Sequence, residues 1–133
     1  AMTVVTTIVG KAIRNGRHWY YLDDGVYGAF SGQIYDHMRY PLEVFSDRSE
    51  RYPSVLAGPT CDSIDIIEEG AHLPELQLGD LVVGHMMGAY TVASATNFNS
   101  LPIPPVVTIN APAAPRDTVT PASSDKAGDP RRS

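Results

Sequence analysis

Short runs of Thr, Val, Ile and aromatic residues, separated by turn-forming residues, fill the first 110 positions of the chain. Residues 3–14 form a run rich in Thr, Val and Ile, and residues 18–23 form an aromatic run. Asn15-Gly16 lies between them, and both residues tolerate the positive φ of a tight hairpin turn. The pattern therefore predicts a β-hairpin over residues 3–23.

The same pattern predicts further strands along the chain, most of them bounded by Gly, Pro, Asn or Asp. Their ranges are 31–35, 42–45, 54–57, 80–85, 90–95 and 103–110. One short helix is predicted over residues 62–69, because Ile64 and Ile67 are three apart and acidic residues flank them. Gly70 is a suitable residue just beyond the end of such a helix. Residues 1–110 are therefore expected to form a mainly β domain.

Residues 111–133 differ in composition from the rest of the chain. Ala, Pro, Ser, Thr, Asp and Arg dominate there, and Val119 is the one large apolar residue. Such a segment buries too little apolar area to offset the entropy lost on ordering. We expect residues 111–133 to form a disordered tail.

Length and charge exclude several classes of protein. With 133 residues the chain is too short for a complete eight-stranded α/β barrel, which takes about 250 residues. No run approaches the roughly 18 apolar residues of a membrane span. The net charge is −5, and residues 1–110 hold six basic against twelve acidic side chains. This balance favours a cationic partner, and we expect neither a nucleic-acid nor a membrane partner.

The chain has one cysteine, Cys61, so an intrachain disulfide is impossible. A lone thiol is more typical of a reducing compartment than of exported proteins. The opening residues are rich in Thr and lack the basic leader of a secretory signal. We therefore expect a cytoplasmic protein.

Four local clusters combine side chains that are able to carry chemistry: Tyr35-Asp36-His37, Gly58-Pro59-Thr60-Cys61-Asp62, Asp62-x-x-Asp65 and Gly88-Ala89-Tyr90-Thr91.

Each cluster also has a purely structural interpretation. Asp36 after a strand often caps backbone amides, and a lone Cys61 is often an inert buried residue. Asp62 and Asp65 suit the first turn of a helix, where acidic side chains are favoured. Tyr90 alone fits a core or rim position. The Gly-Pro-Thr sequence before Cys61, however, predicts a loop that presents the thiol.

Other kinds of site find little support in the sequence. The four histidines show no pairing at helical spacing and no partner cysteines at zinc spacing, so no metal site is predicted. No Gly-x-Ser-x-Gly motif presents a serine nucleophile.

Seven blocks stand out when the segments are taken in order: Trp19 to Phe30, Tyr35-Asp36-His37, Gly58 to Asp65, Leu73-Pro74-Glu75, Gly79-Asp80, Met87 to Thr91 and Phe98-Asn99. Together they resemble the C-terminal β domain of the ornithine/lysine decarboxylases, pyridoxal-phosphate enzymes of the alanine-racemase-like fold. The resemblance covers about residues 3–110. In this family, Asp follows the cysteine of the Gly-Pro-Thr-Cys block, whereas Glu follows it in diaminopimelate decarboxylases. A Greek-key-like β-barrel or sandwich is implied.

The resemblance implies a role for each candidate residue. Cys61 corresponds to the family's proton donor to the substrate Cα, a task that suits a thiol because its pKa lies near neutrality and is tunable. Asp36 and Asp62 correspond to carboxylates that hold the distal ammonium of ornithine or lysine. Tyr90 corresponds to the residue that binds the cofactor phosphate. For Asp65 a structural or interface role is expected.

The resemblance further implies a homodimer with its active site at the subunit interface. Residues matching Asp36 and Tyr90 serve the barrel of their own chain, whereas those matching Cys61 and Asp62 reach the partner's site. The lysine that binds the cofactor covalently belongs to an N-terminal barrel, and neither Lys11 nor Lys126 has its context. We therefore expect a fragment or split piece of an enzyme of polyamine biosynthesis, leading to polyamines such as putrescine. We expect it to be inactive without that barrel, in cis or as a second chain.

Two other functions stay open. One is a non-catalytic interaction protein, similar to decarboxylase-like decoys that bind regulators of the true enzyme. The other is a stand-alone β module that binds polyamines through acidic loops. Cys61 favours the enzyme, because a decoy has no need of a proton donor. The choice between ornithine and lysine is left open, since the length of the substrate pocket depends also on barrel residues.

Overall fold

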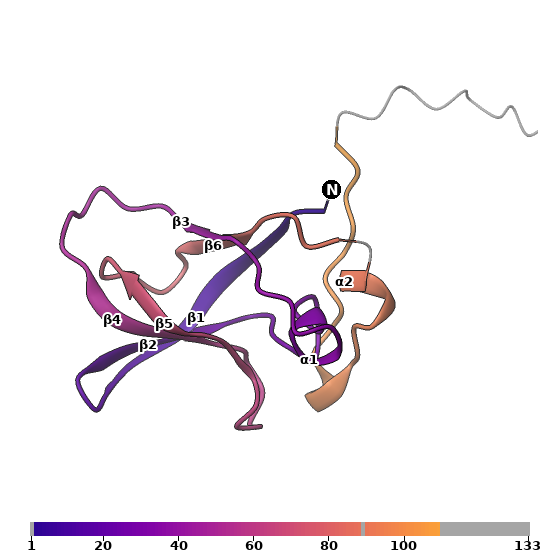
Figure 1. Ribbon diagram of the computed structural model, residues 1–133, viewed down its shortest axis with the longest axis horizontal. Coiled ribbons are helices and arrows are strands. Elements are labelled where there is room, and N and C mark those ends of the chain that lie inside the picture. Colours follow the sequence, from indigo (N-terminus) through magenta and orange to yellow (C-terminus); the bar gives the residue numbers. More distant parts are fainter. Residues whose placement is uncertain (1, 89, 110–133) are drawn as a thin grey trace, which may run out of the picture.

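The computed structural model describes residues 2–88 and 90–109 (Figure 1). Strands dominate residues 4–84, with the short helix α1 between two of them, and two more short helical segments follow the last strand. The elements are β1 (Val4–Arg14), β2 (Arg17–Leu22), α1 (Gly32–Tyr35), β3 (Leu42–Val44), β4 (Tyr52–Ala57), β5 (Ile66–Leu73), β6 (Leu81–Gly84), α2 (Tyr90–Ala93) and the 3-10 helix η1 (Phe98–Ser100).

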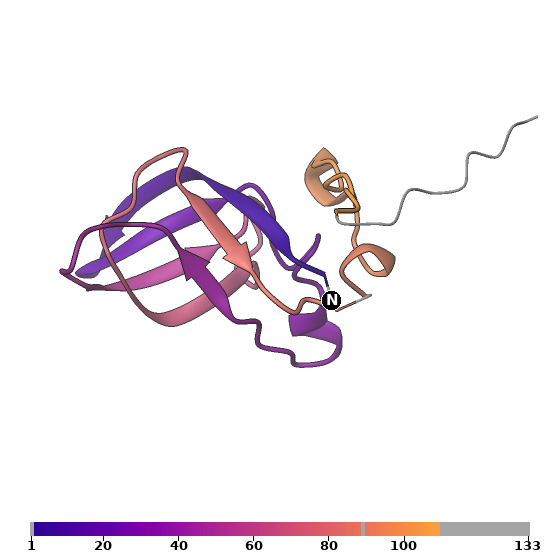
Figure 2. The ribbon, with the colours of Figure 1, turned by 90° about the horizontal axis from the view of Figure 1, so that it is seen from above.

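Within the described residues the strands form one six-stranded sheet in the order β3-β6-β1-β2-β4-β5. Neighbouring strands are antiparallel except β2 and β4, which are parallel. The sheet curls strongly, so that it forms a nearly closed barrel (Figure 2). The prediction of a mainly β, barrel-like domain is confirmed.

The barrel interior holds the side chains of alternate strand positions. Along β1, Val4, Thr6 and Ile8 are buried, while Val5 and Val9 are exposed. Aromatic and aliphatic side chains from every part of the barrel complete the core, and its largest fully buried members are Tyr20, Phe30, Ile8, Leu22, Leu56 and Leu76. This core fixes the positions of the loops that leave the barrel.

The predicted hairpin is confirmed. Asn15 and Gly16 both have positive φ, 51° and 72°, and Arg14 pairs with Arg17 across the turn. These values match the turn type that joins two antiparallel strands with the right-handed twist of a sheet.

Substitution of Gly16 by alanine should lower the free energy of unfolding by about 1 kcal/mol, because a Cβ is disfavoured at positive φ. No heavy atom outside the glycine and its chain neighbours lies within 4 Å of the new Cβ, so the cost is conformational. Gly70→Ala in β5 is the matched control, since Gly70 does not have positive φ. Thermal unfolding should separate the two variants, and equal midpoints would contradict the argument.

Two predicted strands are short helices instead. Residues 31–35 coil into α1, and residues 90–93 of the predicted strand 90–95 form α2. Hydrogen bonds in and before α1 explain why residues 31–35 are not a strand. The Asp24 carboxylate accepts the backbone N–H groups of Gly25 and Ala29. The Ser31 carbonyl accepts the backbone N–H groups of Ile34 and Tyr35. Local acceptors thus satisfy backbone groups that a strand would pair with a neighbour.

The predicted helix over 62–69 is wrong. Residues 62–65 form a turn, and β5 begins at Ile66 and pairs antiparallel with β4. Gly70 lies inside this strand and does not end a helix. The spacing of Ile64 and Ile67 matched a helix by chance, because Ile64 is an exposed residue of the turn and Ile67 is a buried residue of β5.

The predicted strand over 103–110 is also wrong, since residues 103–109 have no regular structure. Pro102, Pro104 and Pro105 lack the N–H groups that a sheet ladder needs. Residue 110 and the predicted tail 111–133 lie outside the described residues.

Candidate functional site

A loop between β4 and β5 carries both Cys61 and Asp62, and a buried carboxylate holds it in place. Asp65 has only 1% of its surface exposed. Its Oδ2 accepts the backbone N–H of Thr60 at 3.0 Å and the Thr60 hydroxyl at 2.6 Å. Its Oδ1 accepts the backbone N–H of Val26 at 2.9 Å. Asp65 therefore fastens the loop to the turn after β2.

Two glycines make room for this carboxylate. A Cβ on Gly58 would lie 2.1 Å from Asp65 Oδ1, and a Cβ on Gly25 would lie 2.2 Å from the same atom. Both distances are far below van der Waals contact, so only glycine permits the buried carboxylate at this place. The glycine before Pro-Thr-Cys-Asp thus has a packing role.

Cys61 presents its thiol at the surface of this loop. The Asn99 side chain donates a hydrogen bond from Nδ2 to Cys61 Sγ at 3.6 Å. Asn99 has a left-handed backbone, with φ 59° and ψ 23°, a conformation that asparagine tolerates better than most residues. The thiol is thus exposed and has an oriented amide donor on one side.

Asp62 is held from two sides. The Tyr27 hydroxyl donates to Asp62 Oδ2, and the Ile64 backbone N–H donates to Oδ1 at 3.1 Å. The hydrogen bond from Tyr27, followed by that from Ile64, lowers the pKa of Asp62 below its usual value. The same bond raises the pKa of Tyr27 to about 12. Asp62 is therefore a carboxylate anion near neutral pH.

Residues 96–99, here called the strap, cross the site from the far end of the described chain. The Tyr27 carbonyl accepts the Thr96 backbone N–H at 2.7 Å and the Thr96 hydroxyl at 2.9 Å. The Phe98 ring stacks on the Tyr27 ring, with 4.3 Å between centroids. The strap therefore covers Tyr27 and, through Asn99, reaches Cys61.

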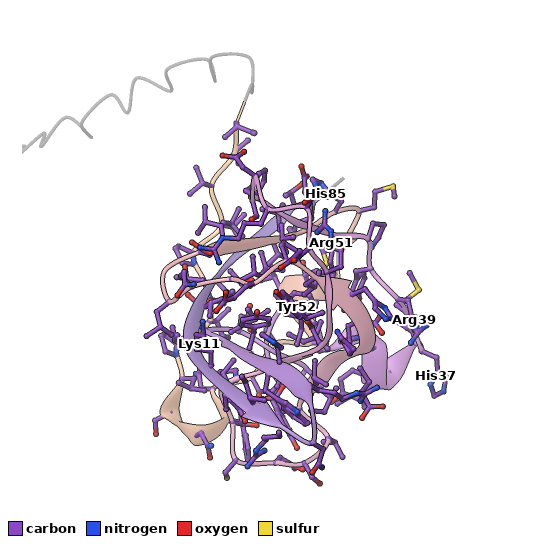
Figure 3. All side chains as sticks on the ribbon, turned by 90° about the vertical axis from the view of Figure 1, so that its left-hand side faces the viewer. Lys11, His37, Arg39, Arg51, Tyr52 and His85 are labelled. Carbon is purple, nitrogen blue, oxygen red and sulfur yellow. The ribbon has the colours of Figure 1, made fainter. Side chains whose placement is uncertain are left out.

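Asp36 lies apart from these groups. It ends α1 with an exposed side chain, and His37 after it has a positive φ of 53°. His37 and Arg39 project from the edge of the molecule in Figure 3. In the ranges 2–88 and 90–109, no hydrogen bond or ion pair joins Asp36 to Cys61 or Asp62. The structure thus groups Cys61 with Asp62 but does not link Asp36 to them within one chain.

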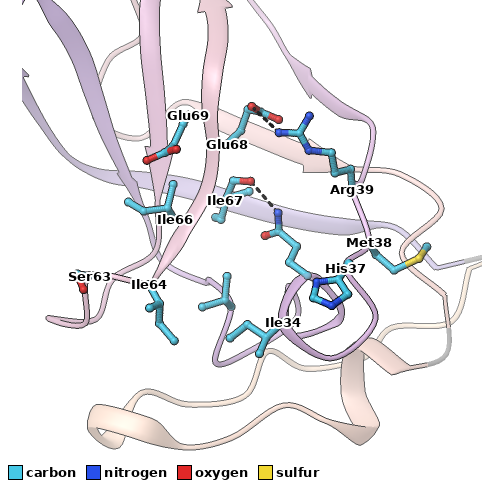
Figure 4. Close-up of a pocket in the computed structure, with 12 residues that line it drawn as sticks. Ile34, His37, Met38, Arg39, Ser63, Ile64, Ile66, Ile67, Glu68 and Glu69 are labelled. Atoms are coloured by element: carbon cyan, nitrogen blue, oxygen red, sulfur yellow. Dashed lines mark hydrogen bonds and ion pairs between the residues drawn. The ribbon is translucent and has the colours of Figure 1, made fainter.

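A groove of about 440 Å³ separates α1 from the start of β5 (Figure 4). Ile34 and Ile64 line it from opposite sides, and Ser63 extends it toward the Asp62 loop. The Gln33 amide donates to the Ile67 carbonyl at 2.7 Å. Arg39 forms an ion pair with Glu68 at 3.6 Å across the groove.

Tyr90 is the first residue of α2, and its side chain lies outside what the structure describes. Its predicted role in phosphate binding therefore stays a prediction.

The described residues do not fit covalent attachment of a pyridoxal cofactor. Lys11 is the one lysine among them, and its Nζ donates to the Leu76 carbonyl at 3.1 Å and pairs with Glu75 at 3.6 Å. An ammonium engaged in this way is a structural group. The thiol of Cys61 and the carboxylate of Asp62, in contrast, fit contacts with an amino-acid substrate.

The described residues also bear on metal sites and on membrane-spanning helices. Across the described ranges, no three His, Cys, Asp or Glu side chains gather so that they could hold a metal ion. None of the helices in that part of the chain has the length and apolarity to cross a membrane.

The family model of the C-terminal sheet domain of pyridoxal-dependent decarboxylases matches residues 1–88, which include the Cys61 loop. The chain belongs to this family. In this decarboxylase sheet domain, the matched segment runs from β1 through β6, so the barrel and the site loop are family features.

Relatives and solved structures agree with this assignment. The chain is 43% identical over 107 residues to the lysine/ornithine decarboxylase of Selenomonas ruminantium, covering 80% of this chain and 27% of that protein. It is 51% identical to the Vibrio vulnificus lysine/ornithine decarboxylase, solved with cadaverine, with a TM-score of 0.80 over 82% of this chain and 30% of that one. It is also 44% identical over 91 residues to antizyme inhibitor 2 of Xenopus laevis, covering 65% of this chain and 20% of that protein. The chain thus spans about a quarter of the length of the first of these relatives.

Sequence reasoning missed the residues that hold the site together. It gave Tyr27, Thr60 and Asn99 no role, although all three stood inside matching blocks. Tyr27 and Asp62 are 35 positions apart, and Asn99 and Cys61 are 38 apart. No local pattern joins such pairs, so only the fold reveals them.

Proposed function

We propose that this chain is the C-terminal part of a pyridoxal-phosphate-dependent ornithine/lysine decarboxylase of polyamine biosynthesis. The observation that carries the proposal is the loop between β4 and β5. It presents an exposed thiol beside a carboxylate whose pKa is lowered, on a backbone that Asp65 fixes. The relatives named above support the same conclusion.

The residues of the chain have defined tasks in this reaction. When bound, pyridoxal phosphate would supply delocalisation for the electron pair left at Cα when carbon dioxide departs. Cys61 transfers its proton from Sγ to that Cα. Asp62, with Asp36, binds the distal ammonium through charge-assisted hydrogen bonds, which selects a diamino acid over a neutral one. Tyr90 provides a hydroxyl for the cofactor phosphate.

Among the described residues, Asp36 makes no hydrogen bond or ion pair with Cys61 or Asp62 of its own chain, which agrees with a site shared by two chains. In a homodimer with a two-fold axis, Asp36 and Tyr90 serve the site of their own chain, while Cys61 and Asp62 complete the partner's. A cytoplasmic location also belongs to the proposal, since an exposed free thiol is best preserved in a reducing compartment.

The proposal is tested by joining this chain to the remaining N-terminal part of the Vibrio vulnificus relative. The fusion protein should release carbon dioxide from radiolabelled lysine or ornithine, whereas the isolated chain should release none. Cofactor absorbance shows whether the fusion protein is loaded. A loaded, folded fusion protein without activity on either substrate would contradict the proposal and favour an interaction protein. Calorimetric binding of putrescine to the isolated chain would instead favour the polyamine-binding module.

Within the active fusion protein, Asp62→Asn should raise the KM for the diamino acid by about 10- to 100-fold, because a hydrogen bond to a charged group is lost. Asp47→Asn is the matched control, since Asp47 is exposed in the loop after β3. A KM that is equal in the two variants would remove Asp62 from the substrate site.

A further inference from the structure

Tyr27 connects three segments that are far apart in the sequence. Its backbone carbonyl binds Thr96, its ring stacks on Phe98, and its hydroxyl donates to Asp62. The turn after β2, the loop before β5 and the strap thus meet at one side chain. A residue in this place is able to transmit the position of the strap to the carboxylate.

The hydrogen bonds to Asp62 determine how its carboxylate points. Tyr27 occupies one lone pair of Oδ2, and the Ile64 backbone N–H occupies one lone pair of Oδ1. The Ser63 backbone N–H also stabilises the anion. A carboxylate has about four acceptor positions in all, so these donors leave capacity for a cation. The donors on both oxygens fix the plane of the carboxylate while its capacity to bind an ammonium group is kept.

We propose that Tyr27 is a positioning residue, whose hydroxyl fixes the Asp62 carboxylate for the distal ammonium of the diamino acid. The proposal rests on the proposed function for the identity of the cation. It does not need a bound cofactor, because the hydrogen bond lies within this chain.

The charged and titratable surroundings of Asp62 let the role of Tyr27 be measured. Tyr27 donates to Asp62, and the acidic groups Asp62, Asp65 and Cys61 around the Tyr27 hydroxyl all raise the pKa of Tyr27. On the side of α1, His37 and Arg39 line the same groove as Ser63, the residue after Asp62. Since the Tyr27 bond is the foremost cause that lowers the pKa of Asp62, its loss should raise that pKa.

Tyr27→Phe removes only the hydroxyl and keeps the ring that stacks on Phe98. Tyr52→Phe is the matched control, because the Tyr52 hydroxyl also donates to a carboxylate, that of Glu50, at 2.7 Å. Tyr52 lies at the end of the barrel that faces the viewer in Figure 3. Both variants remove one tyrosine–carboxylate hydrogen bond, but only one of these bonds involves Asp62.

The first experiment is an NMR titration of isotope-labelled aspartate carboxyls in the isolated chain. Tyr27→Phe should raise the pKa of Asp62, whereas Tyr52→Phe should leave it unchanged. An unchanged pKa of Asp62 in Tyr27→Phe, or a failure of this variant to fold, would overturn the proposal.

The second experiment uses the active fusion protein. Tyr27→Phe should raise KM by about 10-fold with kcat within about two-fold of the parent, because the change affects binding of the distal ammonium. The acidic limb of kcat/KM should move to higher pH, since Asp62 must be ionised to bind the cation. In a double variant, Tyr27→Phe should not raise KM beyond the value that Asp62→Asn already has. Equal losses in kcat and kcat/KM, or an additive effect, would overturn the proposal.

The two experiments separate this inference from the proposed function. A parent fusion protein without activity would contradict the proposed function, while the NMR titration would still decide whether Tyr27 controls the Asp62 carboxylate.

Discussion

Replacement of Asp65 by alanine should lower the free energy of unfolding of this chain by about 3–5 kcal/mol. The buried carboxylate accepts the Val26 N–H, the Thr60 N–H and the Thr60 hydroxyl. Hydrogen bonds to charged groups each contribute about 1.5–3 kcal/mol, and the donors left without partners add a desolvation cost. We place the total below the simple sum because the Thr60 hydroxyl is able to rotate toward water.

Equilibrium denaturation followed by circular dichroism measures this loss. Asp47→Ala is the control, since it removes an exposed carboxylate of the same size. The loss of unfolding free energy in Asp65→Asn should lie between the losses in Asp65→Ala and Asp47→Ala. The amide keeps one acceptor oxygen but turns an NH₂ group toward a donor. A loss below 1 kcal/mol for Asp65→Ala would mean that the loop rearranges without needing the carboxylate.

Cys61→Ala in the fusion protein should reduce the rate of amine formation by about 10²- to 10⁴-fold, the usual contribution of a positioned general acid. The substitution removes the proton that Sγ delivers to Cα, but it touches no residue assigned to the cofactor. Cofactor absorbance should therefore be unchanged. Chromatographic measurement of the amine, compared with released carbon dioxide, reports the failed protonation directly.

Ser63→Ala is the control for Cys61→Ala. Ser63 is exposed in the same loop and offers a hydroxyl two positions away. If Cys61→Ala formed the amine at the parental rate, the thiol would have no part in proton transfer. If Ser63→Ala caused the same loss, the effect would belong to the loop conformation and not to the thiol.

The fold was predictable where local sequence and local structure agree. Asn15-Gly16 specified its turn, and the run rich in Thr, Val and Ile before it specified a strand. Val and Thr occur on both faces of β1, so its buried face needed the three-dimensional structure. The prediction failed for β5, where Ile64 and Ile67 matched a helical period although pairing with β4 determines the structure. Sheet pairing depends on residues distant in sequence, so tertiary contacts overrode the local pattern.

The same reason limits what was predictable at the site. Cys61 and Asp62 were recognised because they are adjacent in a block with a Gly-Pro-Thr lead. Asp65 was expected to be structural, and its contact with Val26, 39 positions away, needed the three-dimensional structure. Tyr27 gave no signal of its own, because a tyrosine after a turn is compatible with many roles.

The parallel pairing of β2 with β4 has a consequence for the evolution of the site. Two parallel strands need a long return connection, and here the chain between Leu22 and Tyr52 provides it. That connection carries Asp36, whereas the Cys61 loop lies between the antiparallel neighbours β4 and β5. Insertions or deletions in the connection are therefore able to change the reach of Asp36 while the strand register behind Cys61 is kept. Under the proposed role of Asp36, changes in this segment would help related chains, together with changes in barrel residues, to adapt to shorter or longer diamino acids.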